Sequence, residues 1–358
     1  MDAIYNTTTM LALMEEIPQV PSFFKDRYFP TGAGDLFTSE FVLTQYRRAA
    51  RTMAKFVAPD IGDIPIERSG FKMSQYAPPR VAPSRHLTVD NLKSAGWGEL
   101  PYANLTPEAR AYKIALDDLT DLERAIGYRE EWMCAQAMIA NGITEDAYAD
   151  DVTPVDKYDL KFYDGVRSPT VYTVGAVWST YALMQADVEA MCNDLTDRGR
   201  PAEDLILGTD TAAKLLSFSD FKNLLDKNSG IYTGEIRAKL SQYPGVVFLG
   251  VVNFNGHELK VFSCRESYVT KPLGVETVNR FFPAKSAMVT APACGHLTYA
   301  AVTQIPRGDE QFRTISGTRV PKLVVDDKND TRSLRMTSRP LPLPAENAPW
   351  IYAANVVS

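Results

Sequence analysis

One stretch of the sequence constrains the fold more than any other, because residues 107–140 are typical of a single long helix. Thr106, Pro107 and Glu108 form a typical start: Thr caps, Pro suits the first helical position, and Glu complements the positive helix end. Between this start and the predicted stop at Asn141 and Gly142, apolar residues recur every three, four or seven positions. These residues are Ala115, Leu119, Leu122, Ile126, Met133, Ala137 and Ala140. At about 1.5 Å per residue the helix would extend on the order of 50 Å, which suits a structural spine.

Upstream of this helix the chain is rich in proline and poor in core signatures. Residues 59–107 contain seven prolines and few apolar runs. Structureless stretches of that length are uncommon inside compact domains and usually serve as functional arms or linkers. Strand-like pieces near residues 71–76 and 87–89 favour a long two-stranded arm that folds back on itself near residues 78–83.

The first forty residues mix short apolar clusters with prolines and glycines, so they cannot form one long helix. This segment includes a group of four aromatic residues, Phe23, Phe24, Tyr28 and Phe29. Exposed aromatics on a loosely structured arm would reduce the solubility of a monomer. We therefore expect this arm to dock on a neighbouring subunit.

Downstream of the long helix the pattern changes to mixed helices and strands. Asn255 and Gly256 favour a type I′ turn, so residues 246–254 and 257–264 are predicted to form a hairpin. Other strands are expected within 157–177 and at 205–208, 287–290, 296–303, 318–325, 331–337 and 350–356, and helices at 181–196, 209–216, 218–226 and 234–242. The architecture is α+β.

Composition excludes several functional classes. No apolar run approaches the roughly 20 residues of a membrane-spanning helix, and the N-terminus lacks a secretory pattern, so no membrane association is expected and the chain should stay in the cytoplasm. A formal charge of −6 disfavours tight DNA binding, which needs clustered Lys and Arg. The widely spaced residues Cys134, Cys192, Cys264 and Cys294 are expected to be buried free thiols.

No motif points to catalysis, a metal or a cofactor. His86, His257 and His296 are dispersed and lack metal-ligand spacing. The glycines within residues 31–35 lack the context of a phosphate loop and are expected to form a turn. The acidic residues within 146–156 and 326–330 miss the spacing of a calcium loop. We therefore assign no catalytic, metal-binding or cofactor-binding residue.

The order of elements, supported by four short stretches, resembles that of a known family. These stretches are Ser74–Val81 (SQYAPPRV), Ser286–Val289 (SAMV), Gly295–Tyr299 (GHLTY) and Leu334–Pro342 (LRMTSRPLP). The chain resembles the major capsid proteins of lambda-like tailed bacteriophages, which have the Hong Kong 97-type capsid fold. An arm, a long hairpin, a spine helix, a compact α/β segment and late strands follow one another in the same order.

The resemblance implies a division of the chain. Residues 1–40 would be an N-terminal arm and 55–104 an extended β-hairpin loop. Residues 41–54, 105–190 and 306–345 would form a peripheral domain that contains the spine helix. Residues 191–305 and 346–358 would form a mixed α/β axial domain around the rotational axes of hexamers and pentamers.

The implied function is structural: copies would close into an icosahedral head that encloses double-stranded DNA. The expected intersubunit contact residues are Phe23, Phe24, Tyr28, Phe29, Lys72, Tyr76, Arg80, Arg85, His86 and Trp132. The resemblance also implies a decoration protein, a scaffold or protease, and a portal as partners, with assembly in the host cytoplasm and residence in the virion. Packaged DNA would lie near an acidic inner wall and bind it weakly and non-specifically.

Three readings stay open beside this one. An encapsulin-like shell would share the fold and enclose a protein cargo. A soluble α+β enzyme would use the long loop as a lid over a substrate site. One branch of the capsid family joins subunits by a lysine–asparagine isopeptide bond; Lys55, Lys72, Lys93 and Asn355 permit that chemistry by position alone.

Overall fold

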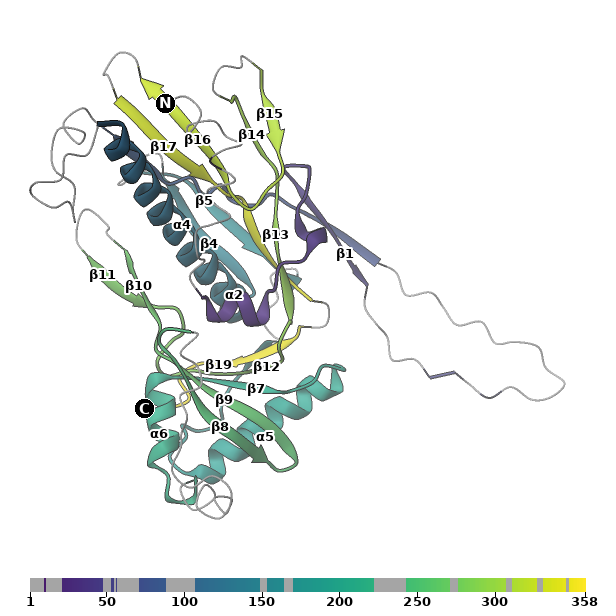
Figure 1. The fold of residues 1–358 in the computed structure, drawn as a ribbon. Helices are drawn as coiled ribbons and strands as arrows, with labels where there is room; N and C mark the ends of the chain where they lie inside the picture. Colours follow the sequence, from purple (N-terminus) through teal and green to yellow (C-terminus); the bar gives the residue numbers. More distant parts are fainter. Residues whose placement is uncertain are drawn as a thin grey trace, which may run out of the picture.

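The computed structural model describes a large part of the chain. It covers residue 10 and the ranges 21–47, 53–54, 56, 71–87, 107–148, 153–163, 170–221, 243–270, 276–306, 311–326, 331–345 and 348–358. Figure 1 shows two halves, one below the other. We call the six-stranded sheet with α5 and α6 the sheet half, and α4 with the small sheets around it the spine half.

The sheet half is a mixed six-stranded sheet. In spatial order its strands are β6 (Val171–Tyr172), β19 (Trp350–Ala353), β12 (Ala287–Thr290), β7 (Asp204–Gly208), β9 (His257–Cys264) and β8 (Val246–Phe254). Most neighbours are antiparallel, but β7 runs parallel to β9 and β19 parallel to β6. The last strand of the chain thus inserts beside β12 and completes the sheet that the middle of the chain begins.

Side chains alternate between the two faces along each strand, and in the central strands β19, β12 and β7 both faces are buried. Helices α5 (Tyr181–Asp197) and α6 (Thr209–Ser217) cover one face, where Leu205 and Val289 lie in their apolar cluster. Ile206 and Met288 point to the other face and join a second cluster with α4 and the short helix α2 (Phe23–Tyr28).

The spine half is organised around α4 (Pro107–Ala140). A β-ribbon of β4 (Gly142–Tyr148) and β5 (Pro154–Lys161) follows it, and a three-stranded sheet of β16 (Val320–Asp326), β17 (Thr331–Thr337) and β3 (Ser84–Leu87) packs on it. The remaining ribbons are β1 (Val42–Arg47) with β2 (Phe71–Tyr76), β10 (Ser267–Thr270) with β11 (Thr277–Arg280), β13 (Gly295–Tyr299) with β18 (Pro340–Pro344), and β14 (Val302–Gln304) with β15 (Arg313–Ile315). A short 3-10 helix, η1 (Ala33–Asp35), follows α2.

Several local predictions are confirmed. The long helix begins at Pro107 and ends at Ala140, and Asn141 turns the chain with a positive φ of 52°. Strands β8 and β9 flank Asn255 and Gly256, whose φ values of 48° and 100° suit the predicted turn. The four cysteines are buried free thiols. The short helix predicted at 234–242 lies outside the described residues.

The predicted pairing of the hairpin arm is wrong. Strand β2 pairs with β1, and β3 pairs with β17, so the chain does not fold back between residues 78 and 83. Instead Arg47 lies opposite Phe71, and the connection between the strands of this ribbon is residues 48–70. Sequence proximity favoured the wrong partner because β1 lies upstream of the whole proline-rich stretch.

The division of the chain also differs in detail. Helix α5 crosses the boundary expected at residue 190 and packs entirely with the sheet half. Residues 295–304, expected in the axial domain, form β13 and β14, and β13 pairs with β18 of the spine half. In the structure the sheet half therefore comprises residues near 170–221, 246–264 and 287–290, and the end of the chain.

Candidate intersubunit surface

Helix α2 fastens the N-terminal segment to both halves. The carboxylate of Glu131 on α4 accepts hydrogen bonds from the backbone N–H groups of Phe24 (2.7 Å) and Lys25 (2.8 Å). A helix leaves its first N–H groups without intrahelical partners, so this carboxylate satisfies two of them. On the other side, Arg27 donates two hydrogen bonds, of 2.6 and 2.8 Å, to the buried carboxylate of Asp204 on β7.

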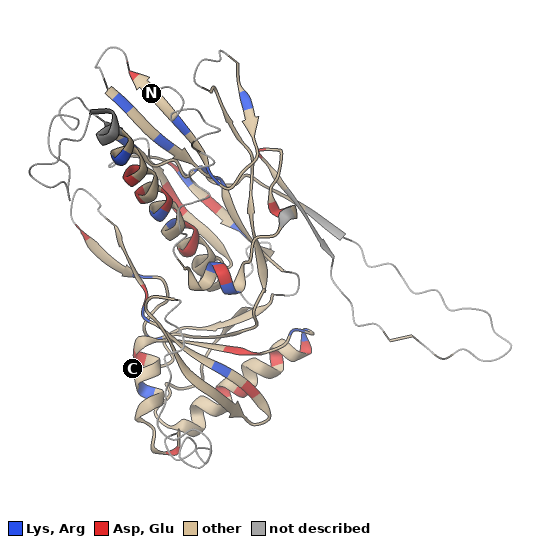
Figure 2. Ribbon diagram, in the orientation of Figure 1, with Lys and Arg blue, Asp and Glu red and all other residues tan. Residues whose placement is uncertain are grey.

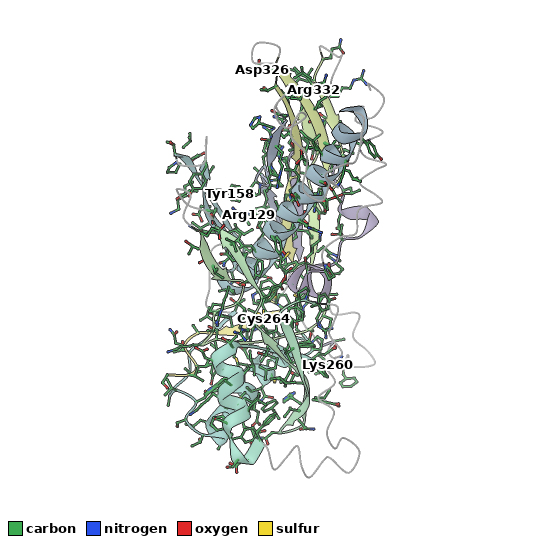
Figure 3. All side chains as sticks on the ribbon, turned by 60° about the vertical axis from the view of Figure 1, so that its left-hand side comes forward. Arg129, Tyr158, Lys260, Cys264, Asp326 and Arg332 are labelled. Atoms are coloured by element: carbon green, nitrogen blue, oxygen red, sulfur yellow. The ribbon has the colours of Figure 1, made fainter. Side chains whose placement is uncertain are left out.

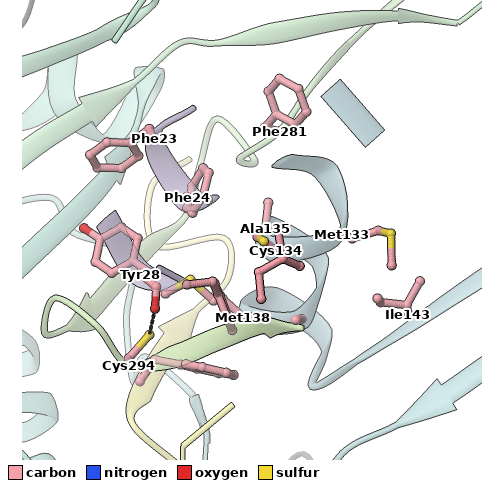
Figure 4. Close-up of a cluster of buried hydrophobic side chains, with 14 of the residues drawn as sticks. Phe23, Phe24, Tyr28, Met133, Cys134, Ala135, Met138, Ile143, Phe281 and Cys294 are labelled. Atoms are coloured by element: carbon pink, nitrogen blue, oxygen red, sulfur yellow. Dashed lines mark hydrogen bonds between the residues drawn. The ribbon is translucent and has the colours of Figure 1, made fainter. Parts of the chain in front are cut away.

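The four aromatics of this segment lie in the chain's own core. Phe23, Phe24, Tyr28 and Phe29 are each 0% exposed. Figure 4 shows the Phe24 ring on the side of α2 that faces α4 and the Phe23 and Tyr28 rings on the opposite side. The Cys294 thiol donates to the Tyr28 carbonyl at 3.6 Å. The expectation that these rings dock on a neighbouring subunit is wrong, because all four are buried within one subunit, where they cover a face of the six-stranded sheet. Sequence analysis missed this because prolines on either side of a six-residue helix made the segment resemble a loose arm.

A buried ionic network lies beside α2. Arg319 forms ion pairs with Glu123 at 2.6 Å and with Glu130 at 2.5 Å, and Lys25 reaches Glu130 at 2.8 Å. Burial alone would raise the pKa of Glu130, but attraction to Arg319 and Lys25 outweighs burial and lowers it. The sequence did contain a signal: both glutamates sit at core spacing on the predicted apolar stripe, four residues after Leu119 and Ile126.

Two other buried carboxyl groups lack such compensation. Burial raises the pKa of Glu131 to about 8, partly offset by the two backbone N–H groups. Burial raises the pKa of Glu266, just after β9, to about 7. Among the described residues, one oxygen of Glu266 is buried without a hydrogen-bond partner, and the two carboxyl groups repel each other.

Four of the six remaining predicted contact residues fall into two groups. Arg85 forms ion pairs with Asp118 (3.7 Å) and Asp121 (2.8 Å) of α4, and His86 hydrogen-bonds Ser333 at 2.6 Å, so both already have partners within the chain. Two aromatics are half-buried against the core: Tyr76 meets Phe162 edge-on at 5.7 Å, and Trp132 lies under Arg129 at 5.0 Å.

Arg80 is exposed beside Glu40, whereas for Lys72 only the backbone position opposite Tyr46 is described.

The ribbons of the spine half carry large apolar side chains into solvent. On β10 and β11, Val269 and Val278 are direct partners and are 55% and 68% exposed. Tyr148 and Val155 are also exposed, at the open end of the β4–β5 ribbon. Apolar side chains gathered at ribbon ends are typical of surfaces that bind another protein. Together these ribbons form the candidate intersubunit surface.

Charge is distributed unevenly over the spine half. In Figure 2, acidic residues follow α4 and basic residues follow β16 and β17. Figure 3 places Asp326 and Arg332 at the far end of the spine half, away from Lys260 and Cys264 of the sheet half. In the ranges that the structure describes, no group of three His, Cys, Asp or Glu side chains could hold a metal ion. The helices of these ranges are too short or too polar to cross a membrane.

Comparisons with known proteins agree with this architecture. The family model of phage major capsid protein E matches residues 6–355. A protein of an Escherichia coli CFT073 prophage, described as its capsid protein, is 17% identical, covers 99% of each chain and has a TM-score of 0.66. The capsids of Ralstonia phage GP4 (10% identity, 95% of this chain and 92% of that one, TM-score 0.49) and bacteriophage PhiM1 (12%, 93% and 86%, 0.48) are also similar. A comparison with curated proteins found no match.

The spine helix, the ribbons around it and the completed sheet define the class: a shell subunit with the Hong Kong 97-type capsid fold, as the α+β prediction expected. The chain belongs to the phage major capsid protein E family, whose model spans nearly all of it. Its role is that of a structural capsid protein and not of an enzyme, and its place is the virion.

Proposed function

We propose that copies of this chain associate as hexamers and pentamers that close into an icosahedral head around double-stranded DNA. The observation that carries the proposal is the family match over residues 6–355. The exposed apolar ribbons support it, because head-to-tail contacts close into rings only if each subunit presents two different complementary surfaces. Within the candidate intersubunit surface, the β4–β5 and β10–β11 ribbons are the two parts proposed to meet different neighbours.

The β1–β2 ribbon is the proposed tie between neighbouring subunits. In Figure 1 it projects from the spine half. An extended ribbon that lies across a neighbour enlarges the buried area, and strand addition supplies backbone hydrogen bonds without requiring a particular sequence. Its connection, residues 48–70, replaces residues 55–104 as the proposed extended loop.

Two alternatives receive less support. An encapsulin-like shell has the same fold, but the matching family is a phage capsid family. An enzyme with a lid loop would need a catalytic constellation, and the family is structural. A decoration protein, a scaffold or protease, and a portal remain proposed partners, together with the lambda-like branch, an expansion of the shell and assembly in the host cytoplasm.

The acidic balance of the chain supports weak contact with packaged DNA. A formal charge of −6 repels phosphates, which permits dense packing of DNA without tight binding to the wall.

The test is to express the full chain alone and to examine it by negative-stain microscopy and sedimentation velocity. We expect shells, tubes or megadalton particles. A monodisperse small oligomer over a range of salt and protein concentrations would contradict the proposal.

A matched variant tests the loop. Because Arg47 lies opposite Phe71, replacing residues 48–70 by Asn-Gly closes β1 and β2 with a two-residue turn. We expect a folded subunit that no longer forms closed particles. A deletion of residues 66–90 would instead remove β2 and β3 from the body of the subunit.

A further inference from the structure

A row of positive side chains crosses the outer face of the β16–β17–β3 sheet. Leu323 and Leu334 are direct partners, and Leu334 packs against α4. Side chains alternate across a strand, so the next pair, Lys322 and Arg335, points away from α4. These two cations are direct cross-strand partners, and like charges in that arrangement repel each other.

Among the residues that the structure describes, no ion pair neutralises the row. Arg80 adds a third cation whose charge lowers the pKa of both strand residues, after burial as the larger cause. The nearby carboxylate of Glu40 is already paired with Arg339 at 3.2 Å. The Nε of Arg335 is buried and has no hydrogen-bond partner among the described residues. Within the described part of the subunit, this face therefore holds cations whose desolvation and mutual repulsion are not compensated by an ion pair.

We propose that the outer face around Arg80, Lys322 and Arg335 binds a carboxylate-bearing segment of a second copy of this chain. Charge complementarity argues for that occupant: the chain has 44 Asp and Glu against 38 Lys and Arg, so a neighbouring copy offers carboxylates in excess. An arginine beside a lysine suits a carboxylate, because the guanidinium donates from a fixed fork and the ammonium adds a point charge. Exposed Val324 on the same face adds apolar area. The inference rests on the proposed assembly into a shell.

Zero-length crosslinking tests the contact directly. A carbodiimide joins an amine to a carboxylate only where the two groups touch, and the crosslinked peptides are identified by mass spectrometry. In assembled particles we expect Lys322 to crosslink to a carboxylate of another copy, whereas unassembled subunits should lack that product.

A charge reversal supplies the second readout. Lys322→Glu places a carboxylate opposite Arg335, so we expect the unassembled subunit to keep or raise its melting temperature while assembly falls at least tenfold. Lys260→Glu, at an exposed lysine of the sheet half, is the matched control and should assemble as the unchanged protein does.

The outcomes separate this inference from the proposed function. Particles without a Lys322 crosslink, together with normal assembly of Lys322→Glu, would overturn the inference and leave the shell intact. A crosslink to a different protein, or a variant that assembles normally but retains less DNA, would overturn the second copy as occupant. Failure of the unchanged chain to associate at all would overturn the proposed function as well.

Discussion

The two halves of this subunit are stabilised in different ways. The sheet half draws most of its strands and both covering helices from residues 170–290, and its central strands alternate apolar residues between two covered faces. The spine half collects strands from residues 42–87, 142–161, 267–280 and 295–344 around one helix. It uses a buried ionic network where the sheet half uses apolar packing, and it leaves one sheet face and several ribbons open. This difference indicates that the sheet half buries most of its apolar side chains within one subunit, whereas the spine half leaves surfaces open that we propose contact other copies of the chain.

Among the variants that distinguish the two halves, loss of Arg319 should reduce the free energy of unfolding most. Arg319→Met leaves Glu123 and Glu130 buried near Lys25 alone, and breaking a buried ionic network from one side costs about 3–5 kcal/mol. Urea denaturation of the unassembled subunit should show this loss, and limited proteolysis should cut the spine half first. Arg85→Ala, which breaks an exposed pair with the same helix, is the control and should cost about 1 kcal/mol or less. Equal losses of stability in the two variants would contradict the claim that a buried ionic network stabilises the spine half.

The next effect concerns the link between the halves. Asp204→Asn keeps the shape of the side chain but removes the charge that binds Arg27, and truncating a buried charge-assisted pair costs roughly 2–4 kcal/mol. We expect faster hydrogen exchange in α2 and in the facing strand β7, with α5 little changed. Unchanged exchange in α2 would show that aromatic packing alone fastens this helix.

The local secondary structure of both halves could be predicted from the sequence, but the contacts between distant segments could not. Capping residues and periodicity located α4 and α5, and a turn dipeptide located β8 and β9, because such signals act within a few residues. The burial of Phe23 and the pairing of β2 with β1 depend on segments that lie far away in the chain. The two glutamates at core spacing were a signal of a buried cation near α4 that the sequence analysis did not use, and nothing in the sequence identifies that cation as Arg319.

A smaller effect is the dependence of stability on pH, which arises from carboxyl groups at the boundary between the halves. Burial raises the pKa of Glu266 from an ordinary value near 4.5 to about 7, so the folded state prefers the protonated form. Stability from this group is therefore full below about pH 4.5 and is lost as pH rises to about 7, with a slope of at most about 1.4 kcal/mol per pH unit. Glu131 extends the loss toward about pH 8. Urea midpoints of the unassembled subunit should fall across this range.

Glu266→Gln isolates that contribution. The amide keeps the size of the side chain and does not ionise, so the fall in the urea midpoint between pH 5 and 7 should become shallower. The same slope in the variant and the unchanged protein would mean that other groups cause it.

The smallest effect concerns the open face. Lys322→Glu replaces a like-charge cross-strand pair by an opposite one, which should stabilise the unassembled subunit by roughly 0.2–1 kcal/mol. Chemical denaturation at low salt measures the gain, and added salt should reduce it. A loss of stability would show that the two side chains do not face each other.

The most direct test of the contrast between the halves is lysine labelling of assembled particles against unassembled subunits. Acetylation read by mass spectrometry compares Lys322 of the open face with exposed Lys260 of the sheet half. If neighbouring copies complete the spine half, Lys322 should be protected severalfold on assembly and Lys260 should change little. Equal labelling of Lys322 in both states would show that this face stays open in the shell.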